Sequence, residues 1–118
     1  MSVTYTFRAL GPTVALSVGS TSSPVVGVSL FPGSSESCNY AALLNSGTTA
    51  VFVSIVGNGQ SAPAAVVPGA GTPTNVIPLP PLMVHPEVWA VGAAPFSVAA
   101  IGAAAGPTTI FITPVQAG

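Results

Sequence analysis

Short stretches in which apolar and polar residues alternate are the clearest pattern along the chain. In residues 3–7, the side chains of Val3, Tyr5 and Phe7 alternate with two threonines, and residues 13–18 and 26–30 repeat this arrangement. Successive side chains of a β-strand point to opposite faces, so a period of two predicts a strand with one buried and one solvated face. The first thirty residues therefore predict three strands that each cover a core on one side.

The rest of the chain adds strands of a more apolar kind. Residues 50–56, with the sequence AVFVSIV, are apolar on both faces, which predicts a central strand covered on both sides. Residues 108–113 carry β-branched side chains at almost every position, a composition typical of strands. Further strands are predicted at residues 39–44, 76–79, 84–91 and 96–101.

Glycine and proline separate these stretches, and the chain has 13 of each. No stretch predicts a capped amphipathic helix, because the apolar runs between glycines and prolines are too short. Eight or nine short strands without helices predict an all-β fold, a single antiparallel β-sandwich domain over residues 1–118. A jelly roll is one connection of the strands that this count allows, but the sequence does not show their order.

Two segments need a separate interpretation. Residues 57–74 are rich in small residues and predict a long loop or an excursion at a sheet edge, with a strand fragment at residues 66–67 and a hairpin turn of positive φ at Asn58-Gly59. Residues 88–106 are uncharged over nearly the length of a membrane helix, but they are mostly alanine and glycine around Pro95. We therefore expect two strands around a turn at residues 92–95. A secretory signal is not expected at the start of the chain, because Gly11 and Pro12 interrupt the apolar stretch early and threonine and serine recur.

Charge is the unusual property of the composition. Charged residues make up 3% of the chain, against about 25% in an ordinary globular protein. They are Arg8, Glu36 and Glu87, and there is no lysine or aspartate. Binding of nucleic acid and of anionic membrane surfaces both require clusters of basic residues, so neither partner is expected. So few ionic groups favour association, and we expect neighbouring molecules to cover much of the surface.

The residues that could carry chemistry are few. His85 and Glu87 would share one face of a strand, but Pro86 lies between them and no nucleophile motif accompanies them. Cys38 is the only cysteine, and the possible metal ligands are too few and too scattered for a zinc site. We therefore expect no catalytic residue, no metal and no cofactor, and the protein is predicted not to be an enzyme. A sugar-binding platform would have to come from the aromatic residues Tyr5, Tyr40, Trp89 and Phe96.

Four segments carry a resemblance to a known family. They are VTYTFRALGPTVALSV, YAALLNSGTTAVFVSIVGNG, NVIPLPP and FSVAAIGAAAGPTTIFITPVQAG. Together they resemble the small β-sandwich structural proteins encoded among the head genes of tailed bacteriophages, some of which decorate or cement the capsid. The resemblance implies a virion component that binds the major capsid protein on the outer capsid surface, as a dimer or trimer, without a small-molecule substrate.

Contact with the capsid is expected from two segments that can dock in an extended form. Proline-rich stretches have a preset backbone and lose less entropy on binding, and neutral contacts are little screened by salt. A tail or fibre module with a receptor-binding role, or a secreted adhesion or carbohydrate-binding module, remains an alternative. The candidate contact residues are Val3, Tyr5 and Phe7 in the first segment and Val76, Ile77, Pro78, Leu79, Pro80 and Pro81 in the second.

Overall fold

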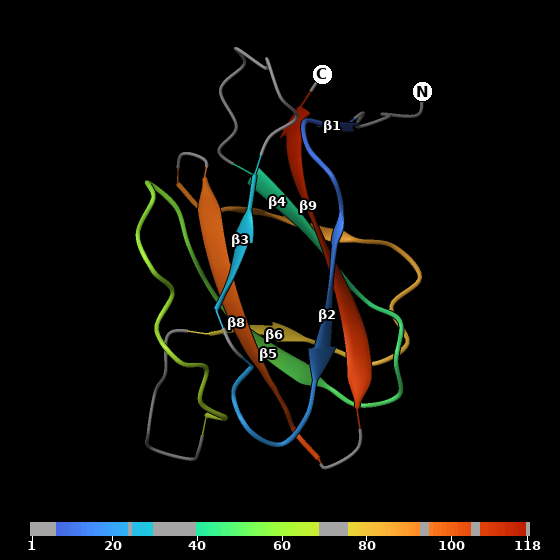
Figure 1. The fold of residues 1–118 in the computed structure, drawn as a ribbon. Coiled ribbons are helices and arrows are strands. Elements are labelled where there is room, and N and C mark those ends of the chain that lie inside the picture. Colours follow the sequence, from blue (N-terminus) through green and yellow to red (C-terminus); the bar gives the residue numbers. More distant parts are fainter. Residues whose placement is uncertain are drawn as a thin grey trace.

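The computed structural model describes residues 7–23, 25–29, 40–68, 76–92, 95–104 and 107–117 (Figure 1). This part of the chain forms nine strands and contains no helix, so no helix in it could span a membrane. The strands are β1 (Phe7–Ala9), β2 (Val14–Val18), β3 (Val26–Val28), β4 (Tyr40–Asn45), β5 (Val51–Val56), β6 (Ile77–Leu79), β7 (Glu87–Ala90), β8 (Phe96–Gly102) and β9 (Thr108–Ala117).

The strands form two antiparallel sheets that pack face to face, as predicted. Sheet A has the order β1-β9-β4-β7, and β2 also pairs with β9; sheet B has the order β3-β8-β5-β6. The ten-residue strand β9 pairs with both N-terminal strands. Its residues 108–112 pair with β2, and its residues 115–117 pair with β1. The two sheets therefore make a β-sandwich with β9 and β4 inside one layer and β8 and β5 inside the other.

The order of the strands is that of a jelly roll. Strand β2 pairs with β9, β3 with β8, β4 with β7 and β5 with β6, so the chain pairs like one long hairpin. This hairpin is rolled up, because β4 also pairs with β9 and β5 also pairs with β8. The roll closes the two sheets over one core, as in other jelly rolls.

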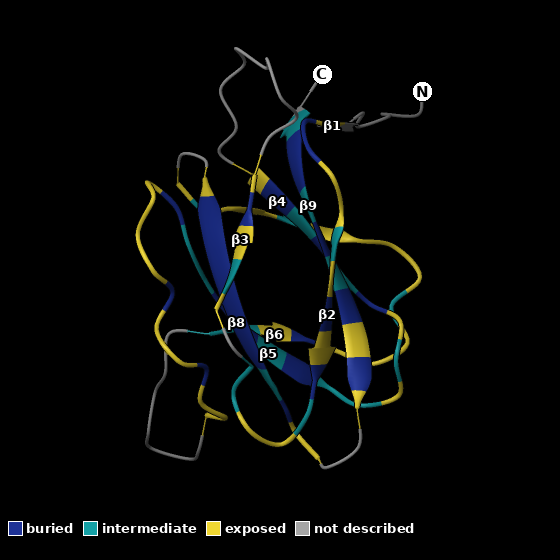
Figure 2. Ribbon diagram, viewed as in Figure 1, coloured by how far each residue is buried: buried dark blue, intermediate teal, exposed yellow. Residues whose placement is uncertain are grey.

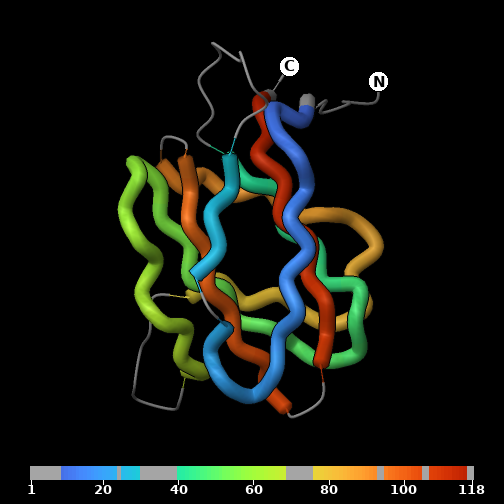
Figure 3. The backbone as a smooth tube through the Cα atoms, viewed as in Figure 1, coloured from blue at the N-terminus to red at the C-terminus, as the bar shows by residue number. Residues whose placement is uncertain are grey.

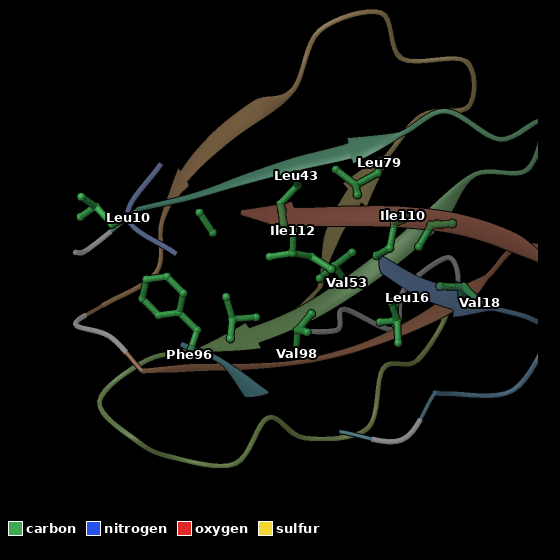
Figure 4. Packing of buried hydrophobic residues seen from close by; sticks show 14 residues of the cluster. Leu10, Leu16, Val18, Leu43, Val53, Leu79, Phe96, Val98, Ile110 and Ile112 are labelled. Atoms are coloured by element: carbon green, nitrogen blue, oxygen red, sulfur yellow. The ribbon is translucent and has the colours of Figure 1, made fainter. Parts of the chain in front are cut away.

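The core lies between the sheets and is filled from alternating strand positions (Figure 4). On β9, Ile110 and Ile112 are fully buried, whereas Thr109 is exposed to solvent. Phe96 and Val98 of β8 meet them from the opposite sheet. The buried cluster consists of Leu10, Leu16, Val18, Val28, Ala41, Leu43, Val51, Val53, Leu79, Phe96, Val98, Ala100, Ile110 and Ile112.

Sheet B is covered on its outer face as well, by residues 60–68, which we call the covering segment (Figure 3). The Ala62 N–H donates to Ser97 Oγ at 2.7 Å, and Ser97 Oγ donates to the Gln60 carbonyl at 2.6 Å. Ser54 of β5 points outward from the core and is nevertheless only 2% exposed. Strand β5 is central, as predicted, but its outward residues Phe52 and Val56 are half-buried, so its outer face is covered only in part. The strand that is buried on both faces is β8.

The turn at Asn58-Gly59 has the predicted backbone but not the predicted role. Asn58 has φ 59° and Gly59 has φ 71°, and the Gln60 N–H donates to the Gly57 carbonyl at 3.2 Å. The chain does not return as a strand beside β5, because β8 and β6 already occupy both edges of β5. The hairpin prediction is wrong, and the turn instead directs the covering segment over sheet B.

Other strand predictions need correction at their ends. Residues 66–67 form no strand and lie in the covering segment, and the predicted strand at 84–91 is shortened to β7 because Pro86 cannot donate to a ladder. Strand β9 extends beyond residue 113 to Ala117, since β1 and β4 both pair with its second half. Strands β7 and β8 flank residues 92–95 as predicted, but they belong to different sheets, so this segment connects the two layers.

Candidate interaction surfaces

Formal charge is nearly absent from the described surface. Glu87 is exposed at the start of β7, and its Oε2 accepts a hydrogen bond of 3.2 Å from Trp89 Nε1. Arg8 lies in β1, where its side chain is outside the description, and Glu36 and Cys38 lie outside the described residues. Whatever binds the described surface must therefore recognise shape, apolar area and neutral hydrogen-bonding groups.

The described residues do not gather catalytic or metal-binding groups. His85 and Glu87 are both exposed, with Glu87 bonded to the Trp89 indole. The described part of the chain holds no group of three or more histidine, cysteine, aspartate or glutamate side chains that could hold a metal ion. Within these residues, the groups that the sequence offered as possible catalytic or metal-binding residues do not come together in one site.

The aromatic residues do not form a common platform. Phe96 is buried in the core, and Tyr5 lies outside the described residues. Tyr40 is opposite Ala90 and Trp89 is opposite Ala41, so Tyr40 and Trp89 point to opposite faces of sheet A. Stacking on a sugar ring requires aromatic rings on one face, so the arrangement of Tyr40, Trp89 and Phe96 argues against the sugar-binding platform considered from the sequence.

The proline-rich segment is an edge strand and not a free arm. Residues 77–79 form β6 beside β5, with Pro78 opposite Phe52. Proline fits at this edge because it has no N–H to leave unpaired on the outside of the sheet. Leu79 is 1% exposed and belongs to the core, so its side chain is not available to a partner. Of the other candidate contacts in this segment, Val76 and Ile77 are half-buried, and Pro78, Pro80 and Pro81 are exposed.

The N-terminal candidates fall mostly outside the described part of the chain. Val3 and Tyr5 precede it, and Phe7 begins β1 with a side chain that is not described. Strand β1 pairs with the end of β9, with Phe7 opposite Ala117. The contact roles predicted for these residues stay predictions.

Sheet A presents an apolar outer face that the sequence analysis did not single out. Ala42 lies opposite Val88 on one side and Thr113 on the other, and Leu44 lies opposite Phe111. All five side chains are half-buried, so part of each is open to solvent. The strand patterns could have indicated this face, since the outward positions of β4 and β9 are apolar or threonine and uncharged. We call this set the sheet A face: Tyr40, Ala42, Leu44, Val88, Phe111 and Thr113.

A buried asparagine organises the end of the sandwich where β4 stops. Asn45 is fully buried, and its Nδ2 donates to the carbonyls of Thr49, Leu79 and Pro80 at 2.8, 3.3 and 3.2 Å. Its Oδ1 accepts from the Gly47 N–H at 3.1 Å. A Cβ on Gly47 would overlap the Thr108 hydroxyl and lie 2.9 Å from the Thr108 Cβ, so this position requires glycine. Asn45 thereby fixes the chain that leaves β6.

That chain forms a projecting apolar loop, residues 82–84, which we call the knuckle. The N–H groups of Leu82 and Met83 donate to the Gly47 and Asn45 carbonyls at 2.8 and 2.9 Å. Met83 packs against the core, while Leu82 and Val84 are 66% and 84% exposed. Leu82 also has φ 58°, a left-handed conformation that glycine or asparagine usually adopts. The knuckle thus holds two apolar side chains outward in a fixed and strained form.

A shallow hollow lies on the outer face of sheet B near the beginning of β8. It is about 330 Å³ in volume and is lined by uncharged residues, including Val25, Gly27, Gln60, Pro95 and Ser97. Gly27 of β3 lies opposite Ser97, and no atom beyond its chain neighbours lies within 4 Å of a Cβ built there. A side chain at residue 27 would therefore begin in open space at the edge of the hollow.

Comparison of the chain with protein-family models, with curated proteins and with solved structures found no match in any of the three. The structure itself defines the class, which is a jelly-roll β-sandwich with an almost uncharged described surface. A fold of this kind hosts many functions, so the function has to be argued from the surfaces.

Proposed function

We propose that the protein is a structural virion component, a capsid cement or decoration protein that binds the outer capsid surface beside copies of itself and stabilises the shell. The sheet A face is the observation that carries this proposal. It is mostly apolar and uncharged, and residues of three neighbouring strands form it, whereas residues 60–68 of the chain itself cover part of the outer face of sheet B.

The chemistry of the sheet A face suits permanent attachment. Apolar contact gains about 25 cal/mol for each Å² removed from water, and salt screens it little. An exposed ion pair contributes about 0–1 kcal/mol and weakens as salt rises. Apolar contact therefore suits a protein that must hold a shell together while the salt concentration changes. The jelly roll agrees with the proposal without carrying it, because both viral capsid proteins and lectins use this fold.

Heating of shells tests the proposal. Shells that lack the protein are heated with and without the purified chain, at low salt and in 1 M NaCl, and the rupture temperature is measured by light scattering. We expect the protein to raise the rupture temperature at both salt concentrations. Equal rupture temperatures with and without the protein would contradict the cementing role, and attachment at the tail in micrographs would favour a tail or fibre module.

A matched pair of variants links this effect to the sheet A face. Ala42→Glu places a charge in the centre of the face, between Val88 and Thr113. Ala64→Glu makes the same change at an exposed position of the covering segment. We expect Ala42→Glu to abolish the protection of shells and Ala64→Glu to keep it, with thermal melting of the free proteins confirming that both are folded.

A further inference from the structure

We propose that two copies of this chain pair edge to edge through strand β2, in an antiparallel arrangement about a two-fold axis at Leu16. The inference deepens the proposed function, on which its relevance to a shell rests, because it names the contact between neighbouring copies. Strand β2 lies beside β9 at an edge of sheet A, and among the described strands it pairs with β9 alone (Figure 1).

Strand β2 differs from the other described edge strands. Edge strands expose unpaired backbone groups, and proteins usually block them with charged side chains, with proline or by making the strand very short. Strands β1, β3 and β6 have three residues each, and β6 also contains Pro78. Strand β7 has four residues, begins with Glu87 and follows Pro86. Strand β2 has five residues in unbroken register with β9, without charge or proline, so it lacks all of these features.

The sequence of β2 selects a second copy as the partner, because it is nearly palindromic. Val14, Leu16 and Val18 alternate with the exposed small residues Ala15 and Ser17. Antiparallel pairing about Leu16 sets Val14 opposite Val18 of the second copy, and Ala15 opposite its Ser17. Side chains on the inner face therefore meet apolar partners, and those on the outer face meet small partners, as cross-strand pairs require.

The other registers of the same two strands fit less well. A shift by one residue would set inward-pointing side chains opposite outward-pointing ones, and a shift by two would leave part of each strand unpaired. The register centred on Leu16 pairs all five residues and forms about four to six backbone hydrogen bonds. Each copy contributes the same residues, so the contact is isologous and closes at a dimer.

The pairing also orients the two copies for attachment to one surface. The two-fold axis of an antiparallel pair within a sheet is perpendicular to that sheet, so both sheet A faces point in the same direction. A contact of five residues from each copy is smaller than the interface of a stable dimer. We therefore expect a weak dimer in solution, which becomes stronger on a shell because attachment raises the effective concentration of the two copies.

Like charges on the outer face of β2 test the pairing. In the Ala15→Lys/Ser17→Lys chain, each lysine would lie opposite a lysine of the second copy. Both positions are exposed, so the variant should remain folded, which thermal melting checks. We expect it to dimerise at least about tenfold more weakly than the unmodified chain in sedimentation at low salt. The Ala64→Lys/Val67→Lys chain has the same charges on the covering segment and should dimerise normally.

A variant of opposite charge tests the register. The Ala15→Glu/Ser17→Glu chain should also dimerise weakly on its own, because each glutamate would face a glutamate. Mixed with the lysine variant of β2, it sets a glutamate opposite every lysine, so we expect a one-to-one heterodimer that weakens at high salt. A mixture that stays monomeric, a lysine variant that dimerises like the unmodified chain, or an unmodified chain that is monomeric at millimolar concentration would overturn the pairing.

Failure of this inference is distinguishable from failure of the proposed function, because sedimentation uses no capsid. Heterodimers in the mixture, together with an unmodified chain that dimerises but does not protect shells, would support the pairing and contradict the cementing role. Protection of shells by a chain that is monomeric at millimolar concentration would support the cementing role and overturn the pairing.

Discussion

Asn45 is a buried polar side chain that links two connections of the fold. Its amide bonds to the carbonyls of Thr49, Leu79 and Pro80, and its Oδ1 accepts from the backbone of Gly47. A buried carbonyl without a partner loses its hydration and gains nothing in return. The side chain of Asn45 thus stabilises the β4–β5 turn and the chain that leaves β6 together.

We predict that Asn45→Ala and Asn45→Asp both destabilise the protein, by about 2–4 kcal/mol. Alanine leaves the carbonyls of Thr49, Leu79 and Pro80 without their donor, and an ionised aspartate would set a negative oxygen against them. Urea denaturation at neutral pH measures the free energy of unfolding. Ser46→Ala, at the neighbouring exposed residue, is the control and should change it by less than about 0.5 kcal/mol. A stable Asn45→Ala variant would show that water replaces the amide.

The covering segment is held on sheet B by hydrogen bonds to the side chains of Ser97 and Ser22. It contains no regular strand, yet Ala62 and Ala65 within it are buried, as the dark blue stretches in Figure 2 show. Ser97 Oγ bonds to two backbone groups at its beginning, and the Ala65 N–H donates to Ser22 Oγ at 3.0 Å. Small side chains on the outer face of sheet B allow the segment to lie close to the sheet.

We predict that Ser97→Ala loosens the covering segment more than it destabilises the sandwich. The substitution removes the Ser97 hydroxyl that the Ala62 N–H and the Gln60 carbonyl bond to, at a cost of about 1–3 kcal/mol. Amide hydrogen exchange should become faster in residues 60–66 and stay slow in β5 and β8, because these strands keep their ladders. Ser17→Ala on the exposed face of β2 is the control. Equal acceleration in β8 would mean that the segment and the sheet unfold as one unit.

For the whole molecule, the scarcity of charge decides how solution conditions act on it. The entire chain has one arginine, no lysine and two glutamates. Salt changes protein stability mainly by screening charged groups and by its effect on the hydration of the surface. Because the chain has so few charged groups, screening by salt should change its stability very little.

We predict that the free energy of unfolding changes by less than about 0.5 kcal/mol between 0.05 and 1 M NaCl. Sodium sulfate should raise it, because sulfate is excluded from protein surfaces and strengthens apolar burial. Urea titrations in the two salts measure both effects with one protein. A large loss of stability in NaCl would point to an ion pair among the three charged residues, which the surface argument does not include.

The positions of the strands could be predicted from the sequence, whereas the surface features could not. Alternation of apolar and polar residues located the strands, because burial of one face imposes a period of two on any strand. It could not indicate that residues 60–68 cover sheet B, since the small residues that permit this are also typical of a loop. Leu82 was missed for a similar reason: its positive φ follows from the contacts of Asn45, and no local signal favours it at a leucine.

The sequence by itself determined the all-β class, the approximate positions of the strands and an almost uncharged surface, because strand periodicity and charge are properties of neighbouring residues or of composition. Only the tertiary structure decided the jelly-roll order, the burial of Asn45, the open sheet A face and the places of the knuckle and the hollow. These features depend on pairings such as β2 with β9 and β3 with β8, which join residues far apart in the chain. Many strand orders would bury the same inner faces, so packing of the whole chain is needed to select one.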